Sequence, residues 1–235
     1  MAQLPEHDMG NGRVSEIPDR IHNRLIQTIV KRLSDKLVVL KGGTALMLAY
    51  GLDRYSEDID YDSNTRIDLL NELDSIMQDT RIIYEVVSNT HTETTSRASI
   101  NYATGRVRNG KFKVEVKNNR ALRVEYINKI SGFWVYTIDK ICEHKLNTTA
   151  VRIKSRDFCD LGFIARHFKS ELSDANLTRL QLLAKDNNLH KLYREQWRED
   201  DFVKIKSFQA TVTSLESIER YRHGRNKEDE YDVER

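Results

Sequence analysis

The first third of the chain alternates between hydrophobic patterns typical of helices and of strands. Apolar side chains recur at helical spacing over residues 18–34, which predicts an amphipathic helix. The apolar run 37–40, with a lysine on each side, predicts a short buried strand. A short helix is predicted over 45–50 and a second strand at 58–60. This first third therefore predicts helices packed on a sheet.

The remaining pattern passes from strands to helices. Charged and apolar residues alternate strictly over 111–117, so a strand there has one polar and one apolar face. From residue 171 onward, apolar residues at helical spacing predict a C-terminal helical bundle. Further predicted elements are a helix over 67–77, strands over 81–88 and 96–104, and a helix that begins at Ile138.

The same patterns divide the chain into four predicted segments. Residues 1–14 show little periodicity and predict a flexible arm. Residues 15–130 carry the predicted strands, and residues 131–219 form the predicted C-terminal helical region. Residues 220–235 are dense in charge and have no apolar face, which predicts a disordered tail.

The composition is that of a soluble protein: of its 235 residues, 39% are hydrophobic and 31% are charged. No run reaches the length of a membrane span and no signal-peptide pattern opens the sequence, so we expect a cytoplasmic protein without membrane contact. The two cysteines, Cys142 and Cys159, fit neither a disulfide framework nor a zinc site.

The charge is unevenly distributed along the chain. Residues 101–170 hold 15 basic and 6 acidic residues, a net +9, whereas the whole chain carries only +2. This middle segment is a candidate surface for a polyanion or a nucleoside triphosphate (NTP). An ordinary lysine-rich face of a sheet is an equally good interpretation of the charge alone.

Two features near the first strand are candidates for chemistry. Lys41-Gly42-Gly43-Thr44 forms a turn whose backbone N–H groups can approach an anion, with Thr44 as the N-cap of the next helix. Asp58 and Asp60 share one face of the second strand and can hold Mg²⁺, which also takes phosphate oxygens as ligands. Asp62 shares that face, so Asp60 and Asp62 are an alternative metal-binding pair, shifted by two residues.

Each feature also has a simpler interpretation. A Gly-Gly turn alone is usually a plain connection from strand to helix, and an Asp-x-Asp sequence is common in solvated loops. Their occurrence together, in this order and spacing, favours phosphoryl or nucleotidyl transfer.

The segments 41–46 (KGGTAL) and 54–60 (RYSEDID) resemble the first motif of the AbiEii/AbiGii toxin family. These are nucleotidyltransferase-fold toxins of bacterial abortive-infection (phage-defence) and toxin–antitoxin systems, related to the MenT toxins. The resemblance covers about residues 20 to 170. It implies an α+β fold of the polymerase-beta-like nucleotidyltransferase type, with a small mixed sheet flanked by helices.

The family comparison implies a third metal-binding carboxylate on a strand beside the Asp58–Asp60 pair. Glu115, on the polar face of the segment 111–117, is the candidate. A lone glutamate between two lysines is more often a cross-strand ion-pair partner on a surface. Glu125 is the alternative, and the sequence leaves the choice between the two open.

A Lys-Leu pair at 145–146 and an Arg-Asp-x-x-Asp-Leu run over 156–161 resemble the second conserved region of the family. The resemblance implies that Lys145 reaches the triphosphate as a point charge on a flexible stem. Asp157 would orient Lys145 or help to deprotonate the acceptor hydroxyl, or would serve only as an acid in the first turn of a helix. The candidates for contact with an RNA backbone are Arg152, Lys154 and Arg156.

These expectations combine into a Mg²⁺-dependent nucleotidyltransferase toxin. An NTP would lie on the turn 41–44 and Lys145, with one or two Mg²⁺ ions on Asp58, Asp60 and Glu115. The nucleoside monophosphate (NMP) would pass to an RNA acceptor, by resemblance the 3′ end of tRNA, and so block translation; a cognate antitoxin is the expected partner. The alternatives are a same-fold enzyme that modifies a protein or small molecule, and a catalytically silent nucleotide- or RNA-binding module.

Overall fold

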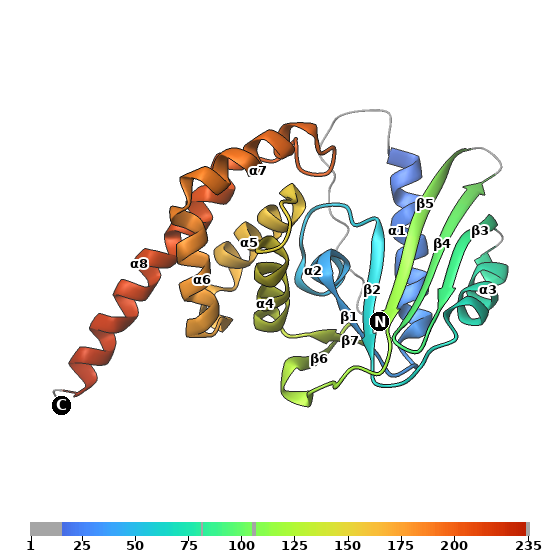
Figure 1. Ribbon diagram of the computed structural model, residues 1–235, viewed down its shortest axis with the longest axis horizontal. Coiled ribbons are helices and arrows are strands. Elements are labelled where there is room, and N and C mark those ends of the chain that lie inside the picture. The colour runs from blue at the N-terminus through green and yellow to red at the C-terminus, as the bar shows by residue number, and fades with distance from the viewer. Residues whose placement is uncertain (1–15, 81, 105–106, 234–235) are drawn as a thin grey trace.

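The computed structural model describes residues 16–233 except 81 and 105–106, and Figure 1 shows their arrangement. In chain order the elements are α1 (Glu16–Leu33), β1 (Val38–Lys41), α2 (Gly42–Tyr50), β2 (Asp58–Ser63), α3 (Leu69–Thr80), β3 (Ile83–His91), β4 (Thr95–Thr104), β5 (Val107–Lys117), the 3-10 turn η1 (Val124–Tyr126), β6 (Ile127–Ile130), β7 (Phe133–Tyr136), α4 (Ile138–Thr149), α5 (Ser155–His167), the 3-10 turn η2 (Lys169–Glu171), α6 (Asp174–Lys185), α7 (Asn187–Glu199) and α8 (Phe208–Val233).

The strands of the described residues form one seven-stranded sheet in the order β3-β4-β5-β2-β1-β7-β6. β2 pairs with β5 in parallel and β1 pairs with β7 in parallel, whereas the other neighbours are antiparallel. The sheet is therefore mixed, and the α+β class predicted from the sequence is confirmed. The short strands β1 and β2 lie in its middle, which places the turn and the acid pair at the centre of the molecule.

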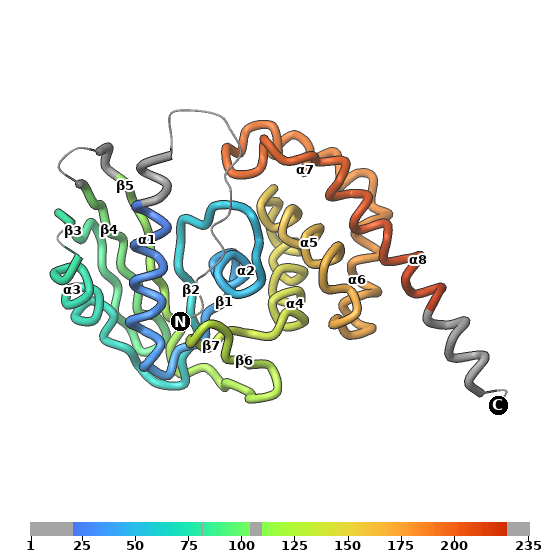
Figure 2. The backbone as a smooth tube through the Cα atoms, turned by 180° about the vertical axis from the view of Figure 1, so that it is seen from behind, coloured from blue at the N-terminus to red at the C-terminus, as the bar shows by residue number. Residues whose placement is uncertain are grey.

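One face of the β3–β5 part of the sheet is covered by α1 and α3, which lie in front of these strands in Figure 2. Leu25, Ile29 and Leu33 of the predicted apolar stripe of α1 are almost fully buried in this packing, and Ile26 beside them is buried as well. The opposite face carries the charged residues of β5 and stays open. Asp58 and Asp60 begin β2 on that open face.

The C-terminal helices extend from the other end of the sheet (Figure 1). α5 lies at their centre with Phe158, Leu161 and Ile164 buried, and it packs against α4, α7 and α8. The helical region predicted after residue 171 is present as α6, α7 and α8. No helix in the described part of the chain is both long and apolar enough to cross a membrane.

Two predicted boundaries differ from the elements that the structure describes. The division predicted at residue 130 falls in the turn between β6 and β7, which both belong to the sheet. The predicted tail, residues 220–235, begins within α8, which the structure describes as far as Val233. The arm predicted over 1–14 lies outside the described residues.

Candidate active site

A cleft of about 390 Å³ opens where β1 and β2 meet α4 and α5. Gly42 and Gly43 of the turn line it, and so do Asp58 and Asp60 of β2. Lys145 and Asp157 of the C-terminal helices line the far wall. The remaining charged residues of its lining are Lys41, Arg54, Glu57, Asp62, Arg120, Arg152, Lys154 and Arg156. The cleft thus joins the glycine turn, the acid pair and a set of cations.

The glycine turn is the start of α2. Gly42 has a φ of +72°, a backbone conformation that favours glycine, and this lets the chain turn directly from β1 into the helix. The first N–H groups of a helix have no partner within the helix, so the first turn of α2 presents donors to an anion. A Cβ on Gly42 would lie 3.6 Å from Asp60 Oδ2, which shows how closely the turn approaches the acid pair.

Thr44 is not the N-cap that the sequence predicted. The helix begins two residues earlier, at Gly42, and Lys41 occupies the cap position without a side-chain hydrogen bond. Thr44 is buried, and its hydroxyl lies 2.8 Å from Ser56 Oγ and also within hydrogen-bond distance of the Asp58 carbonyl oxygen. Thr44 therefore ties α2 to the start of β2 behind the cleft.

The acid pair is flanked by charged residues on both neighbouring strands. Asp60 lies opposite Lys41 of β1 and Glu115 of β5, and Lys113 Nζ lies 3.0 Å from Asp58 Oδ2. Burial raises the pKa of Asp60; Lys113 lowers this pKa, and the nearby carboxylates of Asp58 and Glu115 raise it. Such a site gains free energy by binding a cation.

The sheet register places Glu115, and not Glu125, beside the pair. The Glu115 carboxylate is bound by Arg97 at 2.5 Å and by Lys117 at 3.1 Å. Burial opposes its ionisation, but the hydrogen bonds from Lys117 and Arg97 lower its pKa overall. Glu125 is exposed on η1, just before the edge strand β6, and does not line the cleft. Glu115 therefore neighbours Asp60 as a carboxylate already held by two cations.

These carboxylates fit a magnesium ion in part. Among the described residues, no group of three or more His, Cys, Asp or Glu side chains is arranged to hold a metal. Mg²⁺, however, is commonly bound by one or two carboxylates, with substrate phosphates and water completing its ligands. Asp58 and Asp60, beside a helix N-terminus suited to phosphate, meet that requirement, whereas Glu115 as placed does not contribute.

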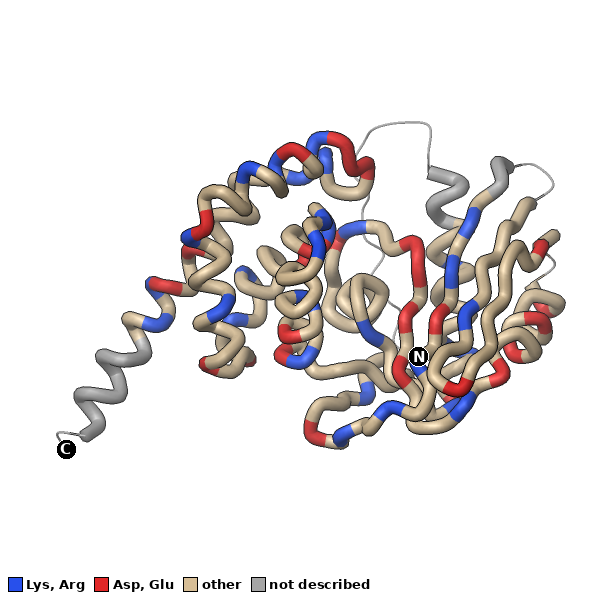
Figure 3. The backbone as a smooth tube through the Cα atoms, in the orientation of Figure 1, with Lys and Arg blue, Asp and Glu red and all other residues tan. Residues whose placement is uncertain are grey.

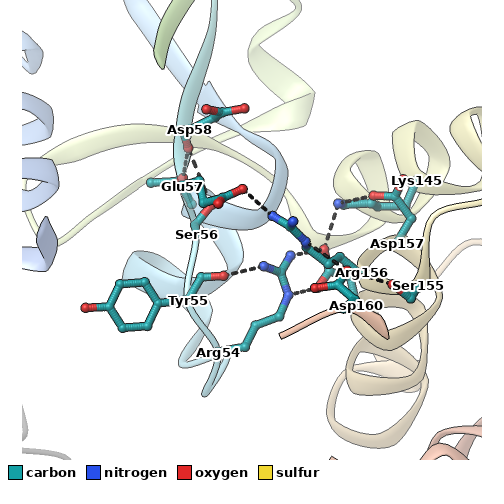
Figure 4. A network of polar contacts seen from close by, with 12 residues as sticks. Arg54, Tyr55, Ser56, Glu57, Asp58, Lys145, Ser155, Arg156, Asp157 and Asp160 are labelled. Atoms are coloured by element: carbon teal, nitrogen blue, oxygen red, sulfur yellow. Dashed lines mark hydrogen bonds and ion pairs between the residues drawn. The ribbon is translucent and has the colours of Figure 1, made fainter. Parts of the chain in front are cut away.

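A buried ion-pair network closes the opposite wall of the cleft (Figure 4). Lys145 Nζ donates to Asp157 at 2.6 Å and lies 2.7 Å from Asp160. Arg54 donates to both carboxylate oxygens of Asp160 at 2.6 Å, and only 4% of the Arg54 side chain and none of the Asp160 side chain is exposed. Burial opposes the charge of Asp160, but Arg54 and Lys145 hold its pKa below the usual range. The network joins the loop before β2 to α4 and α5.

The three candidates for RNA contact line the same cleft. Arg156 bonds Glu57 at 2.7 Å and Asp200 at 3.0 Å, and Arg152 lies 3.3 Å from Asp157. Lys154 is half-buried beside them, and its pKa is lowered by burial and by the two arginines. Arg156 and Lys154 are thus partly buried in the cleft, whereas Arg152, with 57% of its side chain exposed, lies at the rim of the cleft.

His144 of the cleft, and Tyr136 next to it, had no signal in the sequence. His144 is on the same helix as Lys145, and its ring contacts Tyr136 edge-on at 5.2 Å. Tyr136 in turn donates to Asp62 at 2.8 Å, and Lys41 also bonds this carboxylate. Asp62 is thereby engaged on both oxygens, so the structure favours the unshifted Asp58–Asp60 pair.

Comparison with known protein families identifies the family of this chain. The sequence matches a family model described as the nucleotidyl transferase AbiEii toxin of a type IV toxin–antitoxin system, over residues 24–226. The chain belongs to the AbiEii family. It is thus a nucleotidyltransferase toxin of a toxin–antitoxin system, which implies an NTP substrate and a cognate antitoxin. The resemblance stated from its motifs is confirmed.

Solved structures of similar proteins share the fold of this chain. JHP933 from Helicobacter pylori superimposes with a TM-score of 0.81 at 28% identity, covering 93% of this chain and 97% of that one. A candidate nucleotidyltransferase from H. pylori gives a TM-score of 0.80 at 29% identity, covering 91% and 98%. MenT4, a nucleotidyltransferase toxin of Mycobacterium tuberculosis, gives a TM-score of 0.44 at 16% identity, covering 79% of this chain and 68% of that one. This likeness is too distant to support an argument. None of the curated proteins matches the sequence.

Replacing Gly43 with alanine is expected to damage the cleft of this AbiEii protein. The new Cβ would lie 2.6 Å from Arg54 Nη2 and 3.3 Å from Ser56 Oγ, and Arg54 cannot retreat because Asp160 holds it. We expect a loss of about 1–3 kcal/mol of stability and weaker NTP binding, measured by urea unfolding and by titration.

Gly224→Ala in α8 is the matched control, because no atom lies within 4 Å of its added Cβ and alanine favours a helix. Equal stability and equal NTP affinity of the two variants would contradict the close approach of Arg54 to the glycine turn.

Proposed function

We propose that this AbiEii protein transfers an NMP from an NTP to an RNA acceptor, with the 3′ end of tRNA as the expected acceptor and blocked translation as the outcome. The observation that carries the proposal is that the first turn of α2 and the Asp58–Asp60 pair open into one cleft walled by cations. Nucleotidyl transfer requires a phosphate-binding site next to a pair of acidic residues that can bind a metal ion.

The triphosphate would bind at the α2 side of the cleft. The backbone N–H groups of Gly42 and Gly43 suit its terminal phosphates, and the ammonium of Lys145 adds a positive charge from the opposite wall. Lys154 supports the same position, because burial already disfavours its charge and an anion would restore it.

The acid pair would hold magnesium. Asp58 and Asp60 are the proposed ligands, and the ion would supply neutralising charge to the triphosphate when bound. Glu115 stays the candidate for a third ligand only if Arg97 and Lys117 release its carboxylate.

Asp157 would act on Lys145 rather than on the acceptor. Its two carboxylate oxygens accept from Lys145 and from Arg152, and its side chain is only 4% exposed. Both of its oxygens already accept hydrogen bonds from cations, so neither is placed to accept one from an acceptor hydroxyl. We therefore assign Asp157 to positioning the Lys145 ammonium, within the first turn of α5.

The test is to incubate the purified protein with each α-³²P-labelled NTP, Mg²⁺ and total RNA, and to run the products on RNA and protein gels side by side. Label in the tRNA band supports the proposal, and the basic segment 101–170 is the sequence feature that favours this outcome. Label in protein or in a small molecule would favour the first alternative. NTP binding without release of pyrophosphate would favour the silent module.

A further inference from the structure

The path of the acceptor follows from the direction of the reaction, given the proposed function. In phosphoryl transfer the attacking and leaving oxygens lie roughly in line on opposite sides of the phosphorus. With the terminal phosphates on the first turn of α2 and Lys145, pyrophosphate leaves towards the β1 side of Asp60. The acceptor hydroxyl must then approach across Asp60 from the opposite side.

The sheet register identifies what lies on that opposite side. Lys41 of β1, Asp60 of β2, Glu115 of β5 and Arg97 of β4 are successive register partners across four neighbouring strands. The glycine turn follows Lys41 at one end of this row. Glu115 and Arg97 at its other end belong to β5 and β4, whose face is open. The acceptor therefore approaches over these two strands.

That open face presents cations and neutral hydrogen-bonding groups. Lys111 is exposed and pairs in register with Asn101, and Lys113 pairs with Ser99 on one side and Asp58 on the other. The exposed fractions of the Arg97, Lys117 and Lys113 side chains are 44%, 39% and 33%. Figure 3 shows the basic positions of β5 next to the acidic positions of β2. The helices α1 and α3 cover only the other face (Figure 2).

The charge balance distinguishes this face from the inner wall of the cleft. Arg152 and Arg156 are bound to carboxylates of the C-terminal helices and of Glu57. On β4 and β5, Glu115 is shared between Arg97 and Lys117, and Lys113 is bound to Asp58, while Lys111 adds further positive charge. Among the described residues of these two strands, the face beside the acid pair is therefore net positive and accessible, which suits a polyanion.

We propose that the open face of β5 and β4, formed by Lys111, Lys113, Lys117 and Arg97 with Ser99 and Asn101, binds the sugar–phosphate backbone of a single-stranded RNA end. It delivers the terminal hydroxyl to the Asp60 side of the cleft. There the hydroxyl oxygen bonds to the α-phosphorus, and the bond from this phosphorus to the α–β bridging oxygen breaks. Pyrophosphate takes the electron pair, and the hydroxyl proton passes to water.

The experiment uses the double variant Lys111→Gln/Arg97→Gln and a fluorescein-labelled single-stranded oligoribonucleotide. Lys113 is left intact because it touches Asp58. We expect RNA binding to weaken about tenfold, and the slope of log affinity against log salt to fall by about 0.7 per lost phosphate contact. NTP binding measured without Mg²⁺ should stay unchanged, because the Glu115 carboxylate that Arg97→Gln partly frees then has no metal to bind. The melting temperature should change little, because the Arg97–Glu115 pair is partly exposed and Lys117 remains. Lys191→Gln, an exposed lysine on α7, is the control and should bind RNA like the wild type.

Wild-type RNA affinity and salt slope in the double variant would overturn the inference while leaving the proposed function intact, because transfer of label to RNA is scored separately. A wild-type protein that neither binds the oligoribonucleotide nor labels RNA would overturn both. An equal loss of NTP binding in the double variant would assign these cations to the nucleotide and would also overturn the inference.

Discussion

The Asp60→Asn variant is expected to lose nucleotidyl transfer by about a thousandfold or more while keeping its fold. Asparagine has the same shape, but it lacks the negative charge that the site offers to a magnesium ion beside the α2 turn. The measurement is label transfer from α-³²P-NTP, together with the rise in melting temperature that Mg²⁺ and NTP produce in the wild type. We expect that rise to disappear in the variant.

The same substitution is expected to leave stability in the absence of Mg²⁺ unchanged or higher. Burial raises the folded-state pKa of Asp60 above its unfolded value, so the folded state binds the extra proton. The free energy of unfolding therefore falls as the pH rises from the unfolded-state pKa to the folded-state pKa of Asp60. At neutral pH the wild type is destabilised by its buried, ionised carboxylate. The asparagine side chain of the variant does not titrate, so the variant avoids this cost.

Glu93→Gln is the control for Asp60→Asn, because Glu93 is an exposed acid between β3 and β4, away from the cleft. It should transfer label like the wild type. Full activity in the Asp60→Asn variant would refute the assignment of the acid pair, and with it the proposed metal site.

The Asp160→Asn variant is expected to lose about 3–5 kcal/mol of stability, the usual cost of removing one partner from a buried ion pair. Asp160 accepts from Arg54 and Lys145, and all three side chains are almost or fully buried. Without the carboxylate, two buried cations remain with less compensation. Urea unfolding at neutral pH measures the difference in free energy.

The pH dependence of this loss has a definite sign. The pKa of Asp160 is lower in the folded than in the unfolded state. The stabilisation of the fold by the Asp160 carboxylate is therefore complete above the unfolded-state pKa of about 3.9, and it is lost as the pH falls through the folded-state pKa. The gap between the wild type and Asp160→Asn should therefore narrow in acid. Asp53→Asn is the control, because its pair with Lys206 is largely exposed and such pairs contribute less than about 1 kcal/mol. Similar losses in both variants would contradict the special role of the buried network.

Much of the fold could be predicted because local hydrophobic pattern decides it. The stripe of α1, the alternation of β5 and the apolar β1 each gave an element within a few residues of its observed place. The order of the strands could not be predicted, because the parallel pairing of β2 with β5 joins residues as distant in the sequence as Asp58 and Lys113 and leaves no local mark. The start of α2 was also missed, since the positive φ of Gly42 is invisible to periodicity.

The site shows the same division. The glycine turn and the acid pair were recognisable because their residue types carry the chemistry within a short stretch. The roles of Arg54 and Asp160 were not, because the two residues lie 106 positions apart and only the folded chain brings them together. The pairing of Glu115 with Arg97 was equally hidden, as Arg97 comes from a neighbouring strand.

The long separation of Arg54 from Asp160 also bears on when this protein becomes active during its synthesis. The wall of the cleft is complete only after α5 has been synthesised and has docked, so a nascent chain that ends before α5 lacks it. Transfer activity should accordingly appear late in synthesis, and fragments that stop before α5 should have none.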